Sequence, residues 1–397
     1  MNPIRFMLII SALLFCIVAQ PVAAQEADVI AAGVPKYLVG DDPPDYQQIF
    51  TDLVASGITT FIPTFQYQEL PQPLSLGYET DFLPPCDIND PAFAALRAAG
   101  MGLLVPGQLI YQTGNYPPVE QDPLARIGEC AGPGVVTGIL SIDEPFGAVS
   151  DPGDPYRDVR ELYQRVKLIN PDLPVYMVHA PIPAFIEEED GTVRPVTQEE
   201  IDYYLQEVVS FSQWADVVGF DVYPVPPEVA GITAPGLHGQ VADYRQAIPA
   251  YTDWLNVNIP GKEHFLVLQA FSFDHLYGEP GPPDPPTGAR VPTAAEMHDM
   301  ACLALLHGAA EIAWWGQSFL FDPAADSETW ENVLQTSLLV HQGGCLIPGD
   351  LDSDGDVDQA DLGILLSCYQ YDACGDIDGD GDTDQADLGI LLANYTG

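Results

Sequence analysis

The chain has 397 residues, and its 58 acidic and 12 basic side chains give a formal net charge of −46 at pH 7. A surface this acidic repels nucleic acid and anionic lipid, so we expect neither as a partner. Apolar residues make up 47% of the chain and charged residues only 18%, which excludes a disordered acidic chain and predicts a sizeable folded core.

The first 24 residues have the pattern of a secretory signal peptide. Arg5 supplies the positive charge, residues 6–18 form the apolar core, and small residues at 22–24 offer a cleavage site before Gln25. The apolar stretch is shorter than a membrane span requires, and no other segment approaches that length. We therefore expect an exported protein, secreted or held at the cell surface.

Short apolar runs alternate with helical patterns between residues 25 and 345. The strand-like runs are Tyr37–Gly40, Thr59–Thr64, Gly102–Gln108, Val136–Ile142, Pro174–His179, Val217–Val222, Phe265–Phe271 and Ile312–Trp315. The helical patterns are Tyr46–Ala55, Pro91–Ala99, Pro123–Cys130, Tyr156–Ile169, Gln198–Trp214, Val241–Leu255, Ala294–Gly308 and Ser327–His341. Near-continuous apolar strands are typical of parallel sheets buried on both faces. Eight strand–helix units in about 310 residues predict a (β/α)8 barrel, with an open doubly wound sheet as the alternative.

Polar and aromatic side chains gather where the predicted strands end, which is where barrels form their active sites. These residues are Asp143, Glu144, His179, Asp221, Tyr223, Gln269, Asp274, Trp314 and Trp315. Carboxylates and amides hydrogen-bond sugar hydroxyls, and aromatic faces stack on sugar rings, so the set predicts a carbohydrate cleft. Neighbouring strand residues point to opposite faces, so only one of Trp314 and Trp315 can face that cleft.

The end of the fourth strand, Asp143-Glu144-Pro145, resembles the Asn-Glu-Pro motif of retaining glycosidases built on this barrel. The resemblance implies that Glu144 is the proton donor in hydrolysis of O-glycosyl bonds in a polysaccharide. Those enzymes have a nucleophilic Glu at the end of strand seven, where this chain has Gln269. The second catalytic carboxyl would then be Asp221 or Asp274.

A wide separation between Glu144 and Asp221 would suit an inverting enzyme. We assign the remaining strand-end residues to substrate binding: Asp143, His179, Tyr223, Gln269, Trp314 and Trp315. The alternative function is that of a non-catalytic carbohydrate-binding or surface protein, which the missing strand-seven Glu favours.

Two copies of a twelve-residue acidic loop lie near the C-terminus, at residues 350–361 and 376–387. Each has aspartates at loop positions 1, 3, 5, 9 and 12 and glycine at position 6, and Leu-Gly-Ile-Leu-Leu follows it. Calcium requires hard oxygen ligands that converge on one ion, and the glycine permits the sharp turn between them. The loops therefore predict two Ca2+ sites.

Each loop is preceded by a glycine, Gly349 or Gly375, and is followed by a single helix pattern. This duplicated loop–helix unit, residues 346–397, resembles the type I dockerin. The resemblance implies the calcium ligands Asp350, Asp352, Asp354, Asp356, Asp358 and Asp361, and Asp376, Asp378, Asp380, Asp382, Asp384 and Asp387, with Asp356 and Asp382 binding through their carbonyls. It also implies a cohesin-type scaffold partner. A module that acts only as a calcium-stabilised tether is the alternative.

Six cysteines follow the signal segment, and an even number in an exported protein predicts disulfides. Cys368 and Cys374 flank the turn between the two loops, so we expect them to pair. The other four, Cys86, Cys130, Cys302 and Cys345, allow three pairings. Among these we favour Cys86–Cys130 and Cys302–Cys345.

Overall fold

The structure is a computed structural model of the chain. It describes residues 28–32, 46–62, 91–107, 118–122, 124–125, 127–128, 132, 134–147, 153–188, 190–273, 288–316, 327–345, 349–352, 357–371, 374–377 and 382–395. The predicted signal peptide lies outside these residues. Among the helices in the described ranges, none combines the length and the apolar character needed to cross a membrane.

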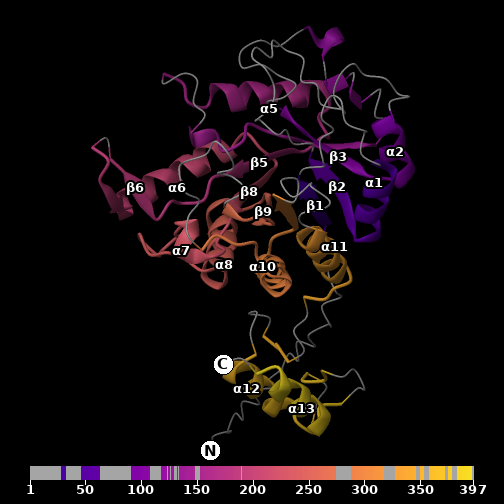
Figure 1. The fold of residues 1–397 in the computed structure, drawn as a ribbon, viewed down its shortest axis with the longest axis vertical. Helices are drawn as coiled ribbons and strands as arrows, with labels where there is room; N and C mark the ends of the chain where they lie inside the picture. The colour runs from indigo at the N-terminus through magenta and orange to yellow at the C-terminus, as the bar shows by residue number, and fades with distance from the viewer. Residues whose placement is uncertain are drawn as a thin grey trace, which may run out of the picture.

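Eight parallel strands close into a barrel, as the sequence predicts, in the order β1-β10-β9-β8-β5-β4-β3-β2. They are β1 Asp28–Ala32, β2 Ile58–Ile62, β3 Gly102–Pro106, β4 Val136–Leu140, β5 Val175–His179, β8 Val217–Val222, β9 Glu263–Gln269 and β10 Glu311–Trp315. Figure 1 shows helices around this barrel and a small separate unit below it. The closed order rules out the open doubly wound sheet.

The first strand is not the predicted one. The chain has two apolar runs near its start, and β1 uses the earlier, in which Val29 is fully buried and pairs with Ile58 and Ile312. The predicted run, Tyr37–Gly40, lies outside the described residues. Both runs are short and apolar, so hydrophobicity alone does not choose between them.

The helices follow the predicted patterns closely. They are α1 Tyr46–Ala55, α2 Pro91–Ala99, α5 Arg157–Ile169, α6 Gln198–Ser212, α8 Tyr244–Asn258, α10 Ala294–Leu306 and α11 Ser327–His341. Capping boxes begin two of them: Thr197 and Glu200 at α6, and Thr293 and Glu296 at α10. Five short elements of the described residues were not predicted: the hairpin strands β6 Phe185–Glu187 and β7 Val193–Pro195, the helix α7 Pro227–Ala230, and the 3-10 helices η1 Val119–Gln121 and η2 Pro145–Gly147.

Alternate residues of each strand pack on opposite sides of the barrel wall. Outward side chains such as Phe220 and Trp314 join the large core beneath the helices. Inward side chains such as Leu104, Val178 and Phe265 form a smaller core inside the barrel. This alternation decides which strand-end residues can reach the cleft.

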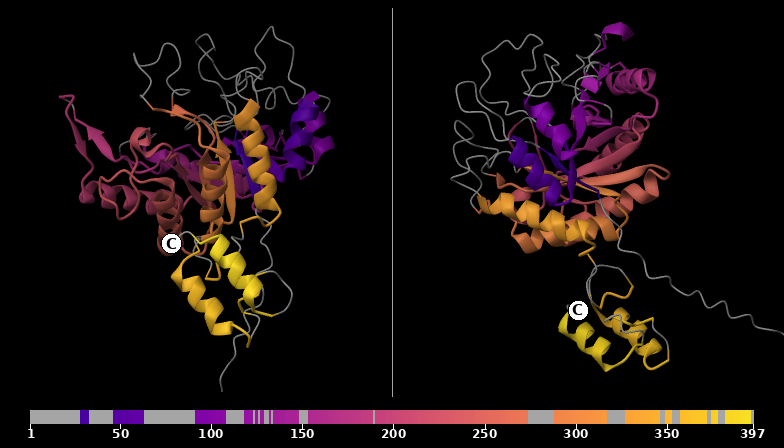
Figure 2. Two further views of the ribbon diagram at one scale, coloured as in Figure 1. Left: turned by 60° about the horizontal axis from the view of Figure 1, so that its bottom comes forward. Right: turned by 90° about the vertical axis from the view of Figure 1, so that its right-hand side faces the viewer.

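The C-terminal unit has a hydrophobic core of its own. It contains the helices α12 Gln359–Cys368 and α13 Gln385–Ala393, packed around Val357, Leu365 and Leu391. Figures 1 and 2 show this pair of helices apart from the barrel.

The two halves of this unit pack against each other reciprocally. A Cβ at Gly349, before the first loop, would lie 2.9 Å from Leu391 Cα in the second helix. A Cβ at Gly375, before the second loop, would lie 3.1 Å from Leu365 Cα in the first helix. Glycine is therefore required at both loop starts for the helices to approach.

Two of the predicted disulfides are present. Cys302 in α10 pairs with Cys345, which follows α11, and Cys368 pairs with Cys374. The first joins the barrel to the segment that leads into the C-terminal unit. Cys86 and Cys130 lie outside the described residues, so their pairing stays a prediction.

Candidate functional site

Three carboxyl groups meet at the C-terminal end of the barrel. Asp143 and Glu144 follow β4, and Asp221 is the fifth residue of β8. A side-chain hydrogen bond joins Glu144 to Asp221, and the hydroxyl of Tyr223 donates to Asp221 Oδ1 at 2.8 Å. The sequence-predicted residues from two strand ends thus form one cluster.

This cluster retains protons that isolated carboxyl groups would lose. Burial, and then the charges of Asp143 and Glu144, raise the pKa of Asp221 well above its usual range. Protein crowded around the Asp143 carboxyl, and then the charge of Glu144, raise the pKa of Asp143 to about 6, although its side chain keeps contact with solvent. Like charges this close cannot all ionise together, so the cluster can supply a proton near neutral pH.

The backbone at Glu144 has a left-handed conformation, with φ of 43°. Non-glycine residues rarely adopt this conformation, because it is strained and persists only where the surrounding structure holds it. Such strained residues are concentrated at functional sites. The Glu144 residue is exposed to solvent, and its carboxyl group touches that of Asp221, which is only 7% exposed. Glu144 is therefore the member of the pair that a bound molecule can reach.

Aromatic rings lie beside the carboxyl groups. Tyr223 and Trp315 are half-buried and pack on the inner core of the barrel. The ring of Phe271 lies 5.1 Å from that of Tyr223 and 5.4 Å from that of Phe273, in edge-to-face contacts. Phe271 and Phe273 were not assigned as site residues, although their position just after a strand was a usable signal.

His179 and Trp314 were predicted to bind substrate, and the structure does not support this. Both are fully buried, because their strand positions point out of the barrel toward the helices. Trp314 Nε1 donates to Ser337 Oγ at 3.0 Å, and His179 Nε2 lies 3.0 Å from Ser212 Oγ. Burial lowers the pKa of His179 to about 3, so its ring is neutral at ordinary pH.

Gln269 was also predicted to bind substrate, and it is instead a structural clamp. Its side chain is fully buried. Its Oε1 accepts from the Val225 amide at 2.9 Å, and its Nε2 donates to the carbonyls of Val225 at 2.6 Å and Phe271 at 2.9 Å. The amide thereby fixes the loop after β8 to the end of β9, and both of its polar atoms are bonded within the protein.

The carboxyl groups of Glu144 and Asp221 are in direct contact, so the wide separation that would suit an inverting enzyme is not found between them. A direct hydrogen bond is shorter than the roughly 5–5.5 Å that separates the two carboxyl groups of retaining glycosidases, and far shorter than the roughly 6.5–9.5 Å of inverting ones. In this arrangement Glu144 and Asp221 are too close together to flank a glycosidic bond. Asp274, the other candidate, lies outside the described residues.

The C-terminal loops bring oxygen ligands together in both repeats. Carboxylate oxygens of Asp350, Asp352 and Asp361 lie within 4.8 Å of one another, as do those of Asp382, Asp384 and Asp387. A set made only of hard oxygen donors suits Ca2+. Asp358 and Asp376 are also described, whereas the predicted ligands Asp354, Asp356, Asp378 and Asp380 lie outside the described residues.

The aspartate at position 12 of each loop ties the loop start to the helix. Asp361 is fully buried, and it accepts from the amides of Leu351 at 2.6 Å, Asp352 at 3.2 Å and Asp358 at 2.8 Å. Asp387 is also fully buried and accepts from the amide of Ile377 at 2.6 Å. Buried carboxylates at these points have the position and charge that a cation requires.

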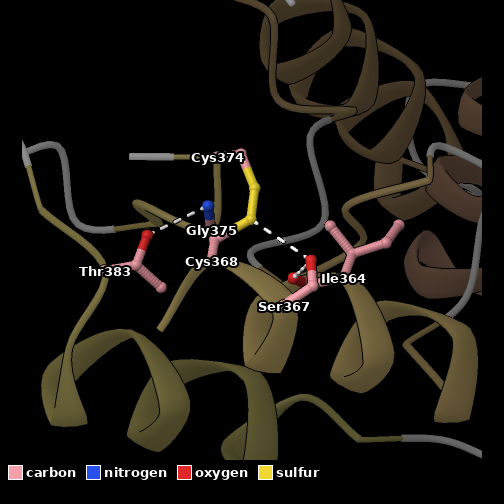
Figure 3. The surroundings of a disulfide bond; sticks show 6 residues. All are labelled: Ile364, Ser367, Cys368, Cys374, Gly375 and Thr383. Carbon is pink, nitrogen blue, oxygen red and sulfur yellow. Dashed lines mark hydrogen bonds between the residues drawn. A yellow bond between two sulfur atoms is a disulfide. The ribbon is translucent and has the colours of Figure 1, made fainter. Parts of the chain in front are cut away.

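Figure 3 shows how a disulfide fixes the start of the second loop. Cys368 ends α12, and its bond to Cys374 holds Gly375, the residue directly before the first ligand of that loop. The Gly375 amide donates to Thr383 Oγ1 at 3.1 Å, so the turn is also bonded to the far side of the same loop.

Comparison with known proteins identifies no family. No protein-family model matches the chain, and no curated protein matches it. A structure described as an alpha-L-fucosidase from Bacteroides thetaiotaomicron is 12% identical, with 81% of this chain and 98% of that chain covered at a TM-score of 0.47.

Two further solved structures are similar at the same low level. A GH18 chitinase from Pseudoalteromonas aurantia is 12% identical, covering 78% of this chain and 100% of that chain at a TM-score of 0.44. Tryptophan synthase from M. tuberculosis is 13% identical, covering 81% and 95% at 0.42. Likenesses this distant say nothing about the reaction, which must be argued from the site.

Proposed function

We propose that the barrel hydrolyses O-glycosyl bonds of a polysaccharide at the cluster of Asp143, Glu144 and Asp221. The observation that carries this proposal is the hydrogen-bonded pair of Glu144 and Asp221 at the C-terminal end of the barrel, beside half-buried aromatic rings. A retained proton is what cleavage of a glycosidic bond needs, since the leaving oxygen must be protonated. The rings of Tyr223 and Trp315 offer faces on which sugars can stack.

In this proposal Glu144 delivers the proton, because it is the exposed member of the pair. Asp221 holds the proton in the resting site, and Tyr223 fixes the orientation of Asp221 through its hydroxyl. Asp143 adds negative charge, which stabilises the positive charge that develops on the sugar ring. The carboxyl group opposite the bond is assigned to Asp274, just past β9.

The test is a screen of polysaccharides and aryl glycosides with the full chain and with Glu144→Gln and Asp221→Asn. Loss of general acid catalysis lowers turnover by about 100-fold to 10,000-fold. The matched control is Asp172→Asn, an exposed acid in the turn between α5 and β5, at the end of the barrel where the strands start. Turnover that survives Glu144→Gln refutes the donor assignment.

A second function, non-catalytic carbohydrate binding, is favoured by one specific observation. Gln269 stands where the glycosidases that the strand-four motif resembles have a nucleophilic Glu, and its amide is fully engaged with Val225 and Phe271. Glycan binding without turnover on any substrate in the screen would establish this second function in place of the first.

We also propose that the C-terminal unit binds two Ca2+ ions and attaches the exported protein to a cohesin-type scaffold. Its exposed helix positions support this, because uncharged side chains occupy them in a strongly acidic chain. Leu366 is 54% exposed and Leu392, its equivalent in the second repeat, is 55% exposed. Exposed apolar side chains repeated in this way are typical of a binding surface.

Calorimetry with Ca2+ and then with a purified cohesin tests the attachment. Two calcium sites with calcium-dependent cohesin binding would support the full proposal. Two calcium sites without cohesin binding would leave the unit as a calcium-stabilised tether.

A further inference from the structure

A cavity of about 340 Å3 opens at the end of the barrel opposite the acid cluster. Its lining comes from the first residues of the strands, and in a parallel barrel all strand starts lie at one end. Thr59, Thr60, Thr137 and Glu311 are the residues with polar side chains that line it, together with Tyr176. Its volume is at the lower end of the roughly 300–1,000 Å3 of ligand pockets.

Two irregularities in the strands build this cavity. Between β1 and β2 the pairing moves from Val29↔Ile58 to Ile30↔Thr60, so Thr59 is an extra residue. Between β3 and β4 it moves from Leu103↔Val136 to Leu104↔Gly138, so Thr137 is an extra residue as well. A bulge turns a side chain away from the regular alternation, and bulges are concentrated at barrel rims and binding sites.

The opposite wall is held in place by a hydrogen bond across the barrel. Tyr176 on β5 donates to Glu311 Oε1 on β10 at 3.1 Å. Open space between the walls depends on Gly102, because a Cβ there would lie 2.6 Å from Thr137 Cγ2 and 2.8 Å from Thr60 Oγ1. The two bulges, Gly102 and the hydrogen bond between Tyr176 and Glu311 lie on different strands. Together they enclose the same cavity.

The lining selects for a hydroxyl-rich molecule. Threonine hydroxyls both donate and accept, and a carboxylate has several lone pairs with which it can accept from neighbouring hydroxyls of a diol. The ring of Tyr176 and the side chain of Leu104 add an apolar surface for the C–H face of a sugar. The charge of Glu311 disfavours anions.

We propose that this cavity binds one uncharged polyhydroxylated molecule, about the size of a monosaccharide, at a site separate from the acid cluster. The site is for binding and not for catalysis, and it does not depend on the function proposed for the acid cluster. A protein that binds sugars at both ends of its barrel can respond to free sugar while its cleft engages a polymer.

The test uses ligand-observed NMR titration of the full chain with D-glucose, D-galactose, D-xylose and D-mannitol, with D-glucuronate as the anionic comparison. We expect at least one neutral probe to bind with a Kd of about 1 mM or weaker. Thr137→Trp fills the cavity mouth and should weaken that binding at least tenfold. Asp202→Asn, which changes an exposed acid on α6, should leave it unchanged, and Asp221→Asn tests whether a probe binds at the acid cluster instead.

A second variant, Glu311→Gln, keeps an oxygen for Tyr176 and removes the charge, so it tests the site even if Thr137→Trp fails to fold. It should weaken binding of the neutral probe and reduce the preference over D-glucuronate. Absence of binding by all neutral probes overturns the proposal. So does binding that Asp221→Asn abolishes while Thr137→Trp and Glu311→Gln leave it intact.

Discussion

Replacement of Asp361 by alanine is the sharpest test of the C-terminal unit. The Asp361 carboxylate is fully buried and accepts hydrogen bonds from three backbone amides, those of Leu351, Asp352 and Asp358. It also belongs to the first cluster of carboxylates that we propose as a calcium site, with Asp350 and Asp352. The variant therefore removes a proposed metal ligand and the main internal support of the loop in one change.

The two effects have different sizes. A hydrogen bond to a charged acceptor contributes about 1.5–3 kcal/mol, and three bonds to one carboxylate are not additive, so we expect a loss of about 3 kcal/mol in the free energy of unfolding without calcium. Asp361→Asn keeps one accepting oxygen, so its loss should be about half of that. Both variants remove the carboxylate charge, so both should abolish the first calcium site.

Calcium calorimetry and thermal unfolding of the full chain separate these effects. The wild type should bind two ions and each variant one, with Asp387→Ala as the matched change in the second repeat. The barrel transition should stay unchanged, because the C-terminal unit has its own core. If Asp361→Ala unfolds the unit more easily but still binds two ions with unchanged affinity, Asp361 is a helix cap and the ligand assignment is wrong.

Three further outcomes are expected. Chelation of calcium should lower the melting temperature of the C-terminal unit alone, because it leaves clustered carboxylates uncompensated; calorimetric scans with and without chelator check this. Replacing Cys368 and Cys374 by serine should cost the unit about 2 kcal/mol by the loop-closure relation and weaken the second calcium site more than the first, measured by calcium titration. The folded pKa of His179, about 3, lies below the unfolded value of about 6.5, so its contribution to stability is complete above pH 6.5 and falls by about 2 kcal/mol at pH 5. Urea unfolding of the wild type and His179→Phe at both pH values checks this, and equal pH slopes would contradict it.

The barrel could be predicted because its signals are local. Helix patterns such as Ser327–His341 and Tyr46–Ala55 agree with the structure at both ends, since their apolar periodicity and boundaries are written in consecutive residues. The first strand was missed because two short apolar runs compete and only pairing with β2 and β10 chooses Val29. A short apolar run does not indicate which distant strands it pairs with.

Side-chain direction explains most errors at the site. His179 and Trp314 end apolar strands just as Asp221 and Trp315 do, but one step along a strand moves a side chain to the other side of the barrel wall. Alternation between Trp314 and Trp315 was recognised in the sequence, although which of the two faces inward depends on the register with β9. Polar residues at strand ends thus predict which end of the barrel carries the site. They do not by themselves predict which of these side chains face into it.

The calcium loops and the acid cluster differ in how their geometry is encoded. The aspartates of each C-terminal loop are neighbours in the sequence, so their spacing itself brings Asp350, Asp352 and Asp361 together in the first repeat and Asp382, Asp384 and Asp387 in the second. Glu144 and Asp221 lie far apart in the sequence and are brought together by the closure of the barrel, where the backbone at Glu144 is left-handed. A hydrogen-bonded pair counts as one catalytic group, because neither member can lose a proton without changing the other. For this reason the second group of a two-carboxyl mechanism must come from outside the pair, which makes Asp274 and Asp143 the residues on which the stereochemical outcome depends.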